Sequence, residues 1–137
     1  MSVISEIIRI EDDGTLSFGN YLMDEKKKVL DFEVDGNLYK VKTYFEVTRL
    51  EKNGKMLMET VPGAAVHNFC MEEDKVSFKL EAKDDINATL ELSPNERYEL
   101  FEDGVSHGEI KTNMSGKISF TVDSQGKEVD ILIKNLT

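Results

Sequence analysis

The sequence predicts an all-β protein, an antiparallel β-sandwich of Ig-like or jelly-roll-like type with about ten to twelve strands. Three observations predict it. Apolar and polar residues alternate with a period of two along many short segments, glycine-containing turn dipeptides separate these segments, and no stretch carries a convincing apolar stripe at helical spacing. The 137 residues fit one domain covering residues 1–137, in which residues 95–137 could form a C-terminal β-meander.

The clearest predicted element is the segment 29–47, V-L-D-F-E-V-D-G-N-L-Y-K-V-K-T-Y-F-E-V. Asp35-Gly36 predicts a two-residue hairpin turn, because a type I′ turn needs positive φ at both central positions. Alternation on both arms gives one apolar and one charged face, which is typical of a half-buried sheet. The same alternation continues to the C-terminus and predicts a core that contains Phe32, Val34, Val41, Phe45, Phe78, Leu80, Leu90, Phe120 and Ile131.

Further turn signals and the N-terminal segment complete the expected strand pattern. Four more dipeptides each separate two alternating runs: Asn53-Gly54, Asp103-Gly104, Ser115-Gly116 and Gln125-Gly126. Residues 3–8 are rich in β-branched side chains, so we expect a strand there, with a short helical turn as the alternative. Because residues 2–10 are apolar on both faces, we expect them to be buried, either across this sandwich or on the sheet of a neighbouring copy in a homo-oligomer.

The stretch E-T-V-P-G-A-A-V-H-N-F at residues 59–69 overlaps the longest uncharged run of the chain and allows two interpretations. Pro62-Gly63 fits the central positions of a type II turn between strands at 56–60 and 65–69. In that interpretation Ala64 and Ala65 are small because another element crosses them. The alternative is a binding loop with Pro62, Gly63 and His67 as its candidate residues.

Composition excludes several classes of function. A net charge of −10 opposes nucleic-acid binding, which needs clustered positive charge. No apolar run approaches the ~20 residues of a membrane span, and no secretion signal is recognised at the N-terminus. The single Cys70 cannot form an intrachain disulfide, which suits a reducing cytoplasm. We therefore expect a cytoplasmic protein without nucleic-acid or membrane partners.

The sequence predicts no catalytic, cofactor or metal site. His67 and Cys70 are three positions apart, so on a strand they point to opposite faces, and only one other histidine, His107, is present. We expect Cys70 to be a small core residue. The acidic clusters lack the spacing of a calcium loop, and neither a G-x-S-x-G elbow nor a glycine-rich phosphate loop occurs.

Four segments carry a resemblance to a known family. They are L-S-F-G-N-Y (16–21), L-Y-K-V-K-T (38–43), V-P-G-A-A-V-H-N-F (61–69) and K-T-N-M-S-G-K-I-S-F (111–120). The chain resembles, over nearly its whole length, short clostridial-type bacterial proteins labelled "endosialidase catalytic beta chain". The resemblance implies a carbohydrate-binding or carbohydrate-active, sialidase-associated protein.

The resemblance carries over no catalytic residue. Sialidases bind the sugar carboxylate with three arginines, and this chain has three, Arg9, Arg49 and Arg97, but 137 residues cannot form a six-bladed propeller. We therefore expect a non-catalytic binding or assembly module with a possible protein or glycan partner, and carbohydrate binding as the alternative. Candidate ligand contacts are Tyr21, Tyr44, Phe101, Arg49 and Arg97.

Overall fold

The structure is a computed structural model that describes residues 3–137, in which thirteen antiparallel strands form two sheets. The strands are β1 (Ile8–Ile10), β2 (Leu16–Phe18), β3 (Lys27–Val34), β4 (Asn37–Tyr44), β5 (Val47–Lys52), β6 (Lys55–Val61), β7 (Ala65–Met71), β8 (Lys75–Glu81), β9 (Asp85–Glu91), β10 (Arg97–Glu102), β11 (Val105–Lys111), β12 (Lys117–Asp123) and β13 (Val129–Asn135). No helix occurs among these residues. The predicted fold class, an all-β antiparallel sandwich, is confirmed.

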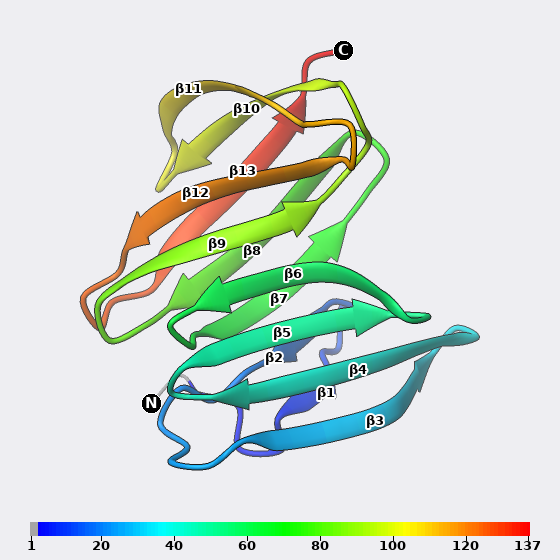
Figure 1. Cartoon of the computed structure of the whole chain (residues 1–137), viewed down its shortest axis with the longest axis vertical. Helices are drawn as coiled ribbons and strands as arrows, with labels where there is room; N and C mark the ends of the chain where they lie inside the picture. Colours follow the sequence, from blue (N-terminus) through cyan, green and yellow to red (C-terminus); the bar gives the residue numbers. More distant parts are fainter. Residues whose placement is uncertain (1–2) are drawn as a thin grey trace.

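The two sheets lie one in front of the other (Figure 1). The seven-stranded sheet has the order β1-β2-β7-β8-β13-β10-β11, and the six-stranded sheet has the order β12-β9-β6-β5-β4-β3. The chain passes from one sheet to the other at β2–β3, β6–β7, β8–β9, β9–β10, β11–β12 and β12–β13. One contiguous apolar cluster, with members from Ile7 to Ile133, fills the space between the sheets.

Three of the predicted turns close hairpins. Asp35-Gly36, Asn53-Gly54 and Asp103-Gly104 have positive φ at both residues and join directly paired strands. This is the geometry that a type I′ turn requires, and it is why asparagine, aspartate and glycine stand there.

The expected C-terminal meander is wrong. Gln125-Gly126 also has positive φ at both residues, yet it leads from β12 in one sheet to β13 in the other. Ser115-Gly116 likewise connects β11 and β12, which belong to different sheets. Instead β12 pairs with β9, and β13 pairs with β8 and β10. The neighbour of each of these strands is therefore a strand distant in sequence and not the strand on the other side of the turn.

The predicted core is mostly correct. Six of the nine residues are buried: Val41, Phe78, Leu80, Leu90, Phe120 and Ile131. Phe32 and Val34 are partly buried against the core, because β3 is an edge strand with a bulge between Val29 and Phe32. The prediction that Phe45 belongs to the core is wrong. Phe45 is 52% exposed, because β4 ends at Tyr44 and the chain reverses at residues 45–46.

The N-terminal segment is only partly buried, since Ser5, Glu6 and Ile10 are exposed, and most of it is not a strand. Ile4, Ile7 and Ile8 are buried against this chain's own sandwich, as the first of the two alternatives predicts. Strand geometry begins only at Ile8, and a bond from Ile7 N to Ile4 O (3.0 Å) closes a turn before it. The strand expected from residue 3 is therefore wrong up to Ile7, and Ser2 lies outside the described residues.

Candidate functional site

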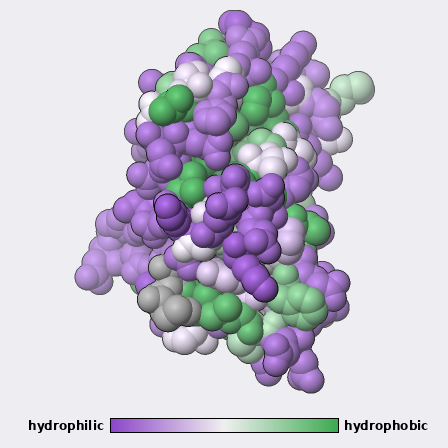
Figure 2. Space-filling view, turned by 90° about the vertical axis from the view of Figure 1, so that its left-hand side faces the viewer, coloured by the Kyte–Doolittle hydropathy of each residue, from purple (hydrophilic) through white to green (hydrophobic). Residues whose placement is uncertain are grey.

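Four connections meet at one end of the sandwich, on the left in Figure 1. They are residues 19–26 between β2 and β3, the turn 45–46, residues 62–64 between β6 and β7, and residues 82–84 between β8 and β9. Figure 2 faces this end and shows hydrophobic side chains gathered in its lower part among hydrophilic ones. We call this region the loop end.

The Pro62-Gly63 segment is a tightly packed connection. The predicted strands at 56–60 and 65–69 are present within β6 and β7, although these strands lie in different sheets. The predicted type II turn is wrong: the Val61–Pro62 peptide is cis, and Gly63 does not have positive φ. Glycine is needed there for space, since a Cβ at Gly63 would lie 2.1 Å from the backbone oxygen of Tyr44.

Neighbouring loops hold this connection through hydrogen bonds. Gly63 N donates to Phe45 O (3.0 Å), and Phe45 N donates to Met23 O (3.0 Å). Ala64 N donates to Thr48 Oγ1 (3.0 Å), and the same hydroxyl donates to Ala64 O (2.9 Å). The expectation that another element crosses the small residues is therefore confirmed at Ala64, which is fully buried.

A pocket of about 390 Å³ opens at the loop end. Its lining includes the predicted candidates Tyr21, Pro62 and Gly63, together with Leu22 and Phe45. Leu22 and Phe45 are 54% and 52% exposed. Large apolar side chains that are exposed and also line the same cavity are unusual on a protein surface. The structure therefore brings Tyr21, a candidate ligand contact, together with Pro62 and Gly63 of the candidate binding loop.

A buried carboxylate contacts Tyr21, one of the residues that line this pocket. Glu81, at the end of β8, is buried and accepts a hydrogen bond from Tyr21 Oη (2.7 Å). Burial, and then the hydrogen bond to this carboxylate, raises the pKa of Tyr21 to about 12. The Tyr21 hydroxyl thus remains protonated at neutral pH and serves as the donor that Glu81 needs.

The other candidate contacts do not gather at the loop-end pocket. Tyr44 packs edge-on against Phe45. Arg49 forms ion pairs with Glu51 (3.1 Å) and Glu59 (3.2 Å) on the six-stranded sheet.

The three arginines are separated and individually paired. Arg97 on β10 forms an ion pair with Glu109 (3.4 Å), and Arg9 on β1 forms one with Glu11 (3.0 Å). Together with the pairing of Arg49, this means that no shared arginine clamp for a carboxylate exists among residues 3–137.

His67 and Cys70 lie on β7, away from the loop-end pocket. A bulge between them, with Asn68 at a φ of 55°, changes the alternation that the sequence analysis assumed. Cys70 is half-buried, so the prediction of a core cysteine is wrong. Within residues 3–137, no group of three or more His, Cys, Asp or Glu side chains is placed to hold a metal ion.

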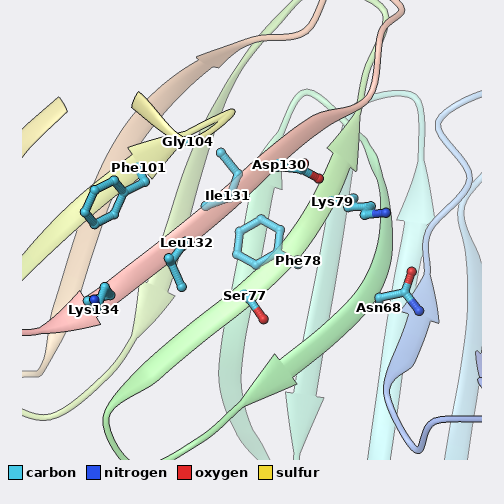
Figure 3. Close-up of a pocket in the computed structure, with 10 residues that line it drawn as sticks. All are labelled: Asn68, Ser77, Phe78, Lys79, Phe101, Gly104, Asp130, Ile131, Leu132 and Lys134. Atoms are coloured by element: carbon cyan, nitrogen blue, oxygen red, sulfur yellow. The ribbon is translucent and has the colours of Figure 1, made fainter. Parts of the chain in front are cut away.

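A second surface, which the sequence analysis did not identify as a site, lies on the outer face of the seven-stranded sheet (Figure 3). This sheet-face groove has a volume of about 590 Å³ and runs over β8, β13 and the β10–β11 turn. Phe101 and Leu132 are directly opposed across β10 and β13 and form its apolar part. Lys79 and Asp130, also directly opposed, and Lys134 supply charged groups along it.

One signal in the sequence marks this groove. In V-D-I-L-I-K-N, the outward positions of β13 are Asp130, Leu132 and Lys134, so Leu132 is an apolar residue where alternation predicts a polar one. Phe101 breaks the alternation of β10 in the same way. Sequence alone could not show that these two exceptions are neighbours.

Comparison with known proteins gives no match to a protein family model, a curated protein or a solved structure. Residues 3–137 also contain no helix that is long and apolar enough to cross a membrane.

Proposed function

We propose that the chain is a non-catalytic binding module and that the sheet-face groove is its ligand-binding surface. The observation that supports this most strongly is the Phe101–Leu132 pair on the outer face of the seven-stranded sheet. The inward neighbours Ile131 and Ile133 already supply the core contacts of β13. An apolar pair on the opposite face, in a hollow, lies outside this core and resembles the apolar part of a ligand site.

Polar groups beside the apolar pair could orient a ligand. Lys79 and Ser77 project from β8, and Asp130 and Lys134 project from β13 (Figure 3). Among residues 3–137, neither the two lysines nor Asp130 forms an ion pair. The groove thus offers hydrogen-bond donors and acceptors beside its apolar part.

Carbohydrate binding is the second candidate function, and the same geometry favours it. A sugar ring presents C–H groups on one face and hydroxyl groups around its rim, so it needs an apolar surface bordered by both donors and acceptors. Phe101 provides an aromatic surface, and Lys79 and Asp130 lie beside the apolar pair. The resemblance expected from the sequence to proteins labelled as endosialidase chains would imply the same ligand class.

Two further inferences accompany this function. The three arginines are each engaged by their own carboxylates, which supports a binding role over a sialidase-type site. We also infer a cytoplasmic location, for which the single Cys70 is the support. A homo-oligomer remains a prediction, and light scattering on the purified chain tests it.

The test combines a glycan array with an NMR titration of a library of small molecules. We expect ligands that shift the backbone signals of β8 and β13, with binding that is weakened at least about tenfold by Phe101→Ser or Leu132→Thr. Leu30→Thr is the matched control, because Leu30 is 59% exposed on β3 of the other sheet. Ligand-induced shifts that map away from the groove, or equal binding by the groove variants, would overturn the proposal.

The glycan array distinguishes a carbohydrate-binding module from a module that binds another class of ligand. Glycans that bind in the groove support the carbohydrate candidate. Non-sugar ligands that bind there, with an empty array, support the binding module and exclude the carbohydrate candidate.

A further inference from the structure

The loop end exposes apolar side chains from several connections. Leu22, Phe45 and Pro62 come from three different connections and line the same pocket of about 390 Å³. Single exposed apolar residues are ordinary on protein surfaces, but a cluster around a hollow marks an interaction site. We call these three residues the loop-end patch.

Hydrogen bonds hold the backbone of this patch in place. Leu22 N donates to Asn20 Oδ1 (3.0 Å), and the bonds from Phe45 N to Met23 O and from Gly63 N to Phe45 O connect the three loops in series. A surface fixed in this way loses little conformational entropy when a partner binds. The patch is therefore preorganised, in contrast to loops that become ordered on binding.

The charged side chains that line the pocket are mainly acidic. Asp24 and Asp84 line the pocket with Lys83 as the only basic side chain, and exposed Glu25 and Glu46 stand in the same loops. The remaining lysine of these loops, Lys26, has its ammonium 5.9 Å from the centre of the Tyr44 ring. An apolar centre with an acidic rim complements an apolar side chain that is flanked by basic residues.

We infer that the loop-end patch docks a segment of a partner protein in which a large apolar residue, such as Leu or Phe, is flanked by Lys or Arg. The apolar residue enters the pocket between Leu22, Phe45 and Pro62, and the basic residues lie against Asp24 and Asp84. The inference concerns a different surface from the sheet-face groove, so it stands or fails independently of the proposed ligand.

Charge distinguishes this partner from the two other candidates for an exposed apolar patch. In a second copy of the chain, the same acidic residues would face one another, and each copy carries a net charge of −10. An anionic membrane surface would be repelled by the same rim. A basic segment is attracted by both the rim and the net charge.

The test uses an array of synthetic peptides with a central Phe, Leu or Ser and with flanks of Lys/Arg, Gly/Ser or Asp/Glu, probed with the full labelled chain. We expect binding only where an apolar centre is combined with basic flanks. Affinity measured by fluorescence anisotropy should fall at least about tenfold in Phe45→Ser, because this variant removes an apolar anchor contact. It should also fall as salt screens the acidic rim.

Two variants control the experiment. Met114→Ser removes an 85% exposed apolar side chain from the β11–β12 turn, at the other end of the sandwich, and should leave peptide binding unchanged. Asp24→Lys combined with Asp84→Lys keeps the apolar patch and should shift the preference to acidic flanks. Unfolding curves of all variants show whether the fold is retained.

Several outcomes would overturn the inference. They are the absence of binding to any basic apolar peptide, equal binding of peptides with a central Ser, and unchanged binding by Phe45→Ser. A dimer that disappears in Phe45→Ser, seen by light scattering, would assign the patch to a second copy. Binding to phosphatidylcholine vesicles that Phe45→Ser abolishes would assign it to a lipid surface.

Discussion

Replacing Gly63 by alanine should destabilise the protein far more than the usual cost of a glycine substitution in a loop. The added Cβ would lie 2.1 Å from Tyr44 O and 3.4 Å from the carbonyl carbon of Phe45. A relaxed carbon–oxygen contact is about 3.3–3.6 Å, so the two backbone segments must move apart by more than about 1 Å. Because both atoms belong to backbone, no side-chain rotation can relieve this contact.

The magnitude follows from what the movement breaks. The bond from Gly63 N to Phe45 O is 3.0 Å long and would be lost, which costs about 1–3 kcal/mol when buried groups remain unpaired. Forcing extra volume into a packed region costs about 1–3 kcal/mol more. We therefore expect Gly63→Ala to lower the free energy of unfolding by about 2–6 kcal/mol, a large part of the 5–15 kcal/mol that is ordinary for a domain.

The assay is urea denaturation followed by far-ultraviolet circular dichroism, with Gly36→Ala as the matched control. Gly36 has a φ of 82°, but no atom lies within 4 Å of the point that a Cβ would occupy, so its substitution costs only the conformational term of about 1–2 kcal/mol. If Gly63→Ala lost no more stability than Gly36→Ala, steric contact with Tyr44 would not be the reason for glycine at this position.

Three further predictions concern side chains. Phe78→Ala should cost about 3–5 kcal/mol and Phe45→Ala less than about 1 kcal/mol, since only the first empties the core; equal losses in thermal unfolding would contradict this. Tyr21→Phe removes the donor to buried Glu81 and should cost about 1.5–3 kcal/mol. Because the pKa of Tyr21 is raised from 10 to about 12 on folding, the wild-type advantage should persist below pH 10 and disappear toward pH 12, as Tm values across this range will show. A hydrogen bond to Asp123, and then the negative charge of Asp123, raise the pKa of Asp85, so this pair of carboxyl groups favours the folded state less as pH rises. Asp85→Asn should therefore raise Tm at pH 7 but not at pH 3. An equal gain in Tm at both pH values would refute the repulsion between Asp85 and Asp123.

The local structure of this chain was predictable because it depends on neighbouring residues. Asp35-Gly36 and Asn53-Gly54 have the left-handed backbone that their turns need, and the alternation of Val76, Phe78 and Leu80 correctly gave the buried face of β8. The turn at residues 45–46 has neither positive φ nor a turn dipeptide. It was therefore missed, and Phe45 was wrongly placed in the core.

The candidate surfaces were only partly predictable. Pro62, Gly63 and Tyr21 were singled out for composition and chemistry, and the structure places them at one pocket. Leu132 breaks the alternation of β13, but its significance depends on Phe101 standing opposite it on β10, about thirty residues away in sequence. A single exception to a pattern carries no information about its neighbours in space.

The sequence by itself determined the β class, three of the hairpin turns and the inward face of the regular strands. These features follow from backbone preferences and from the two-residue period of a strand, and both act within a few residues. Tertiary structure alone decided that Gln125-Gly126 passes between sheets while Asp103-Gly104 closes a hairpin, although both have the same φ signs. The choice depends on which distant strand completes the hydrogen bonds and buries the apolar face of each segment, and the same long-range packing brings the loops of the loop-end patch together.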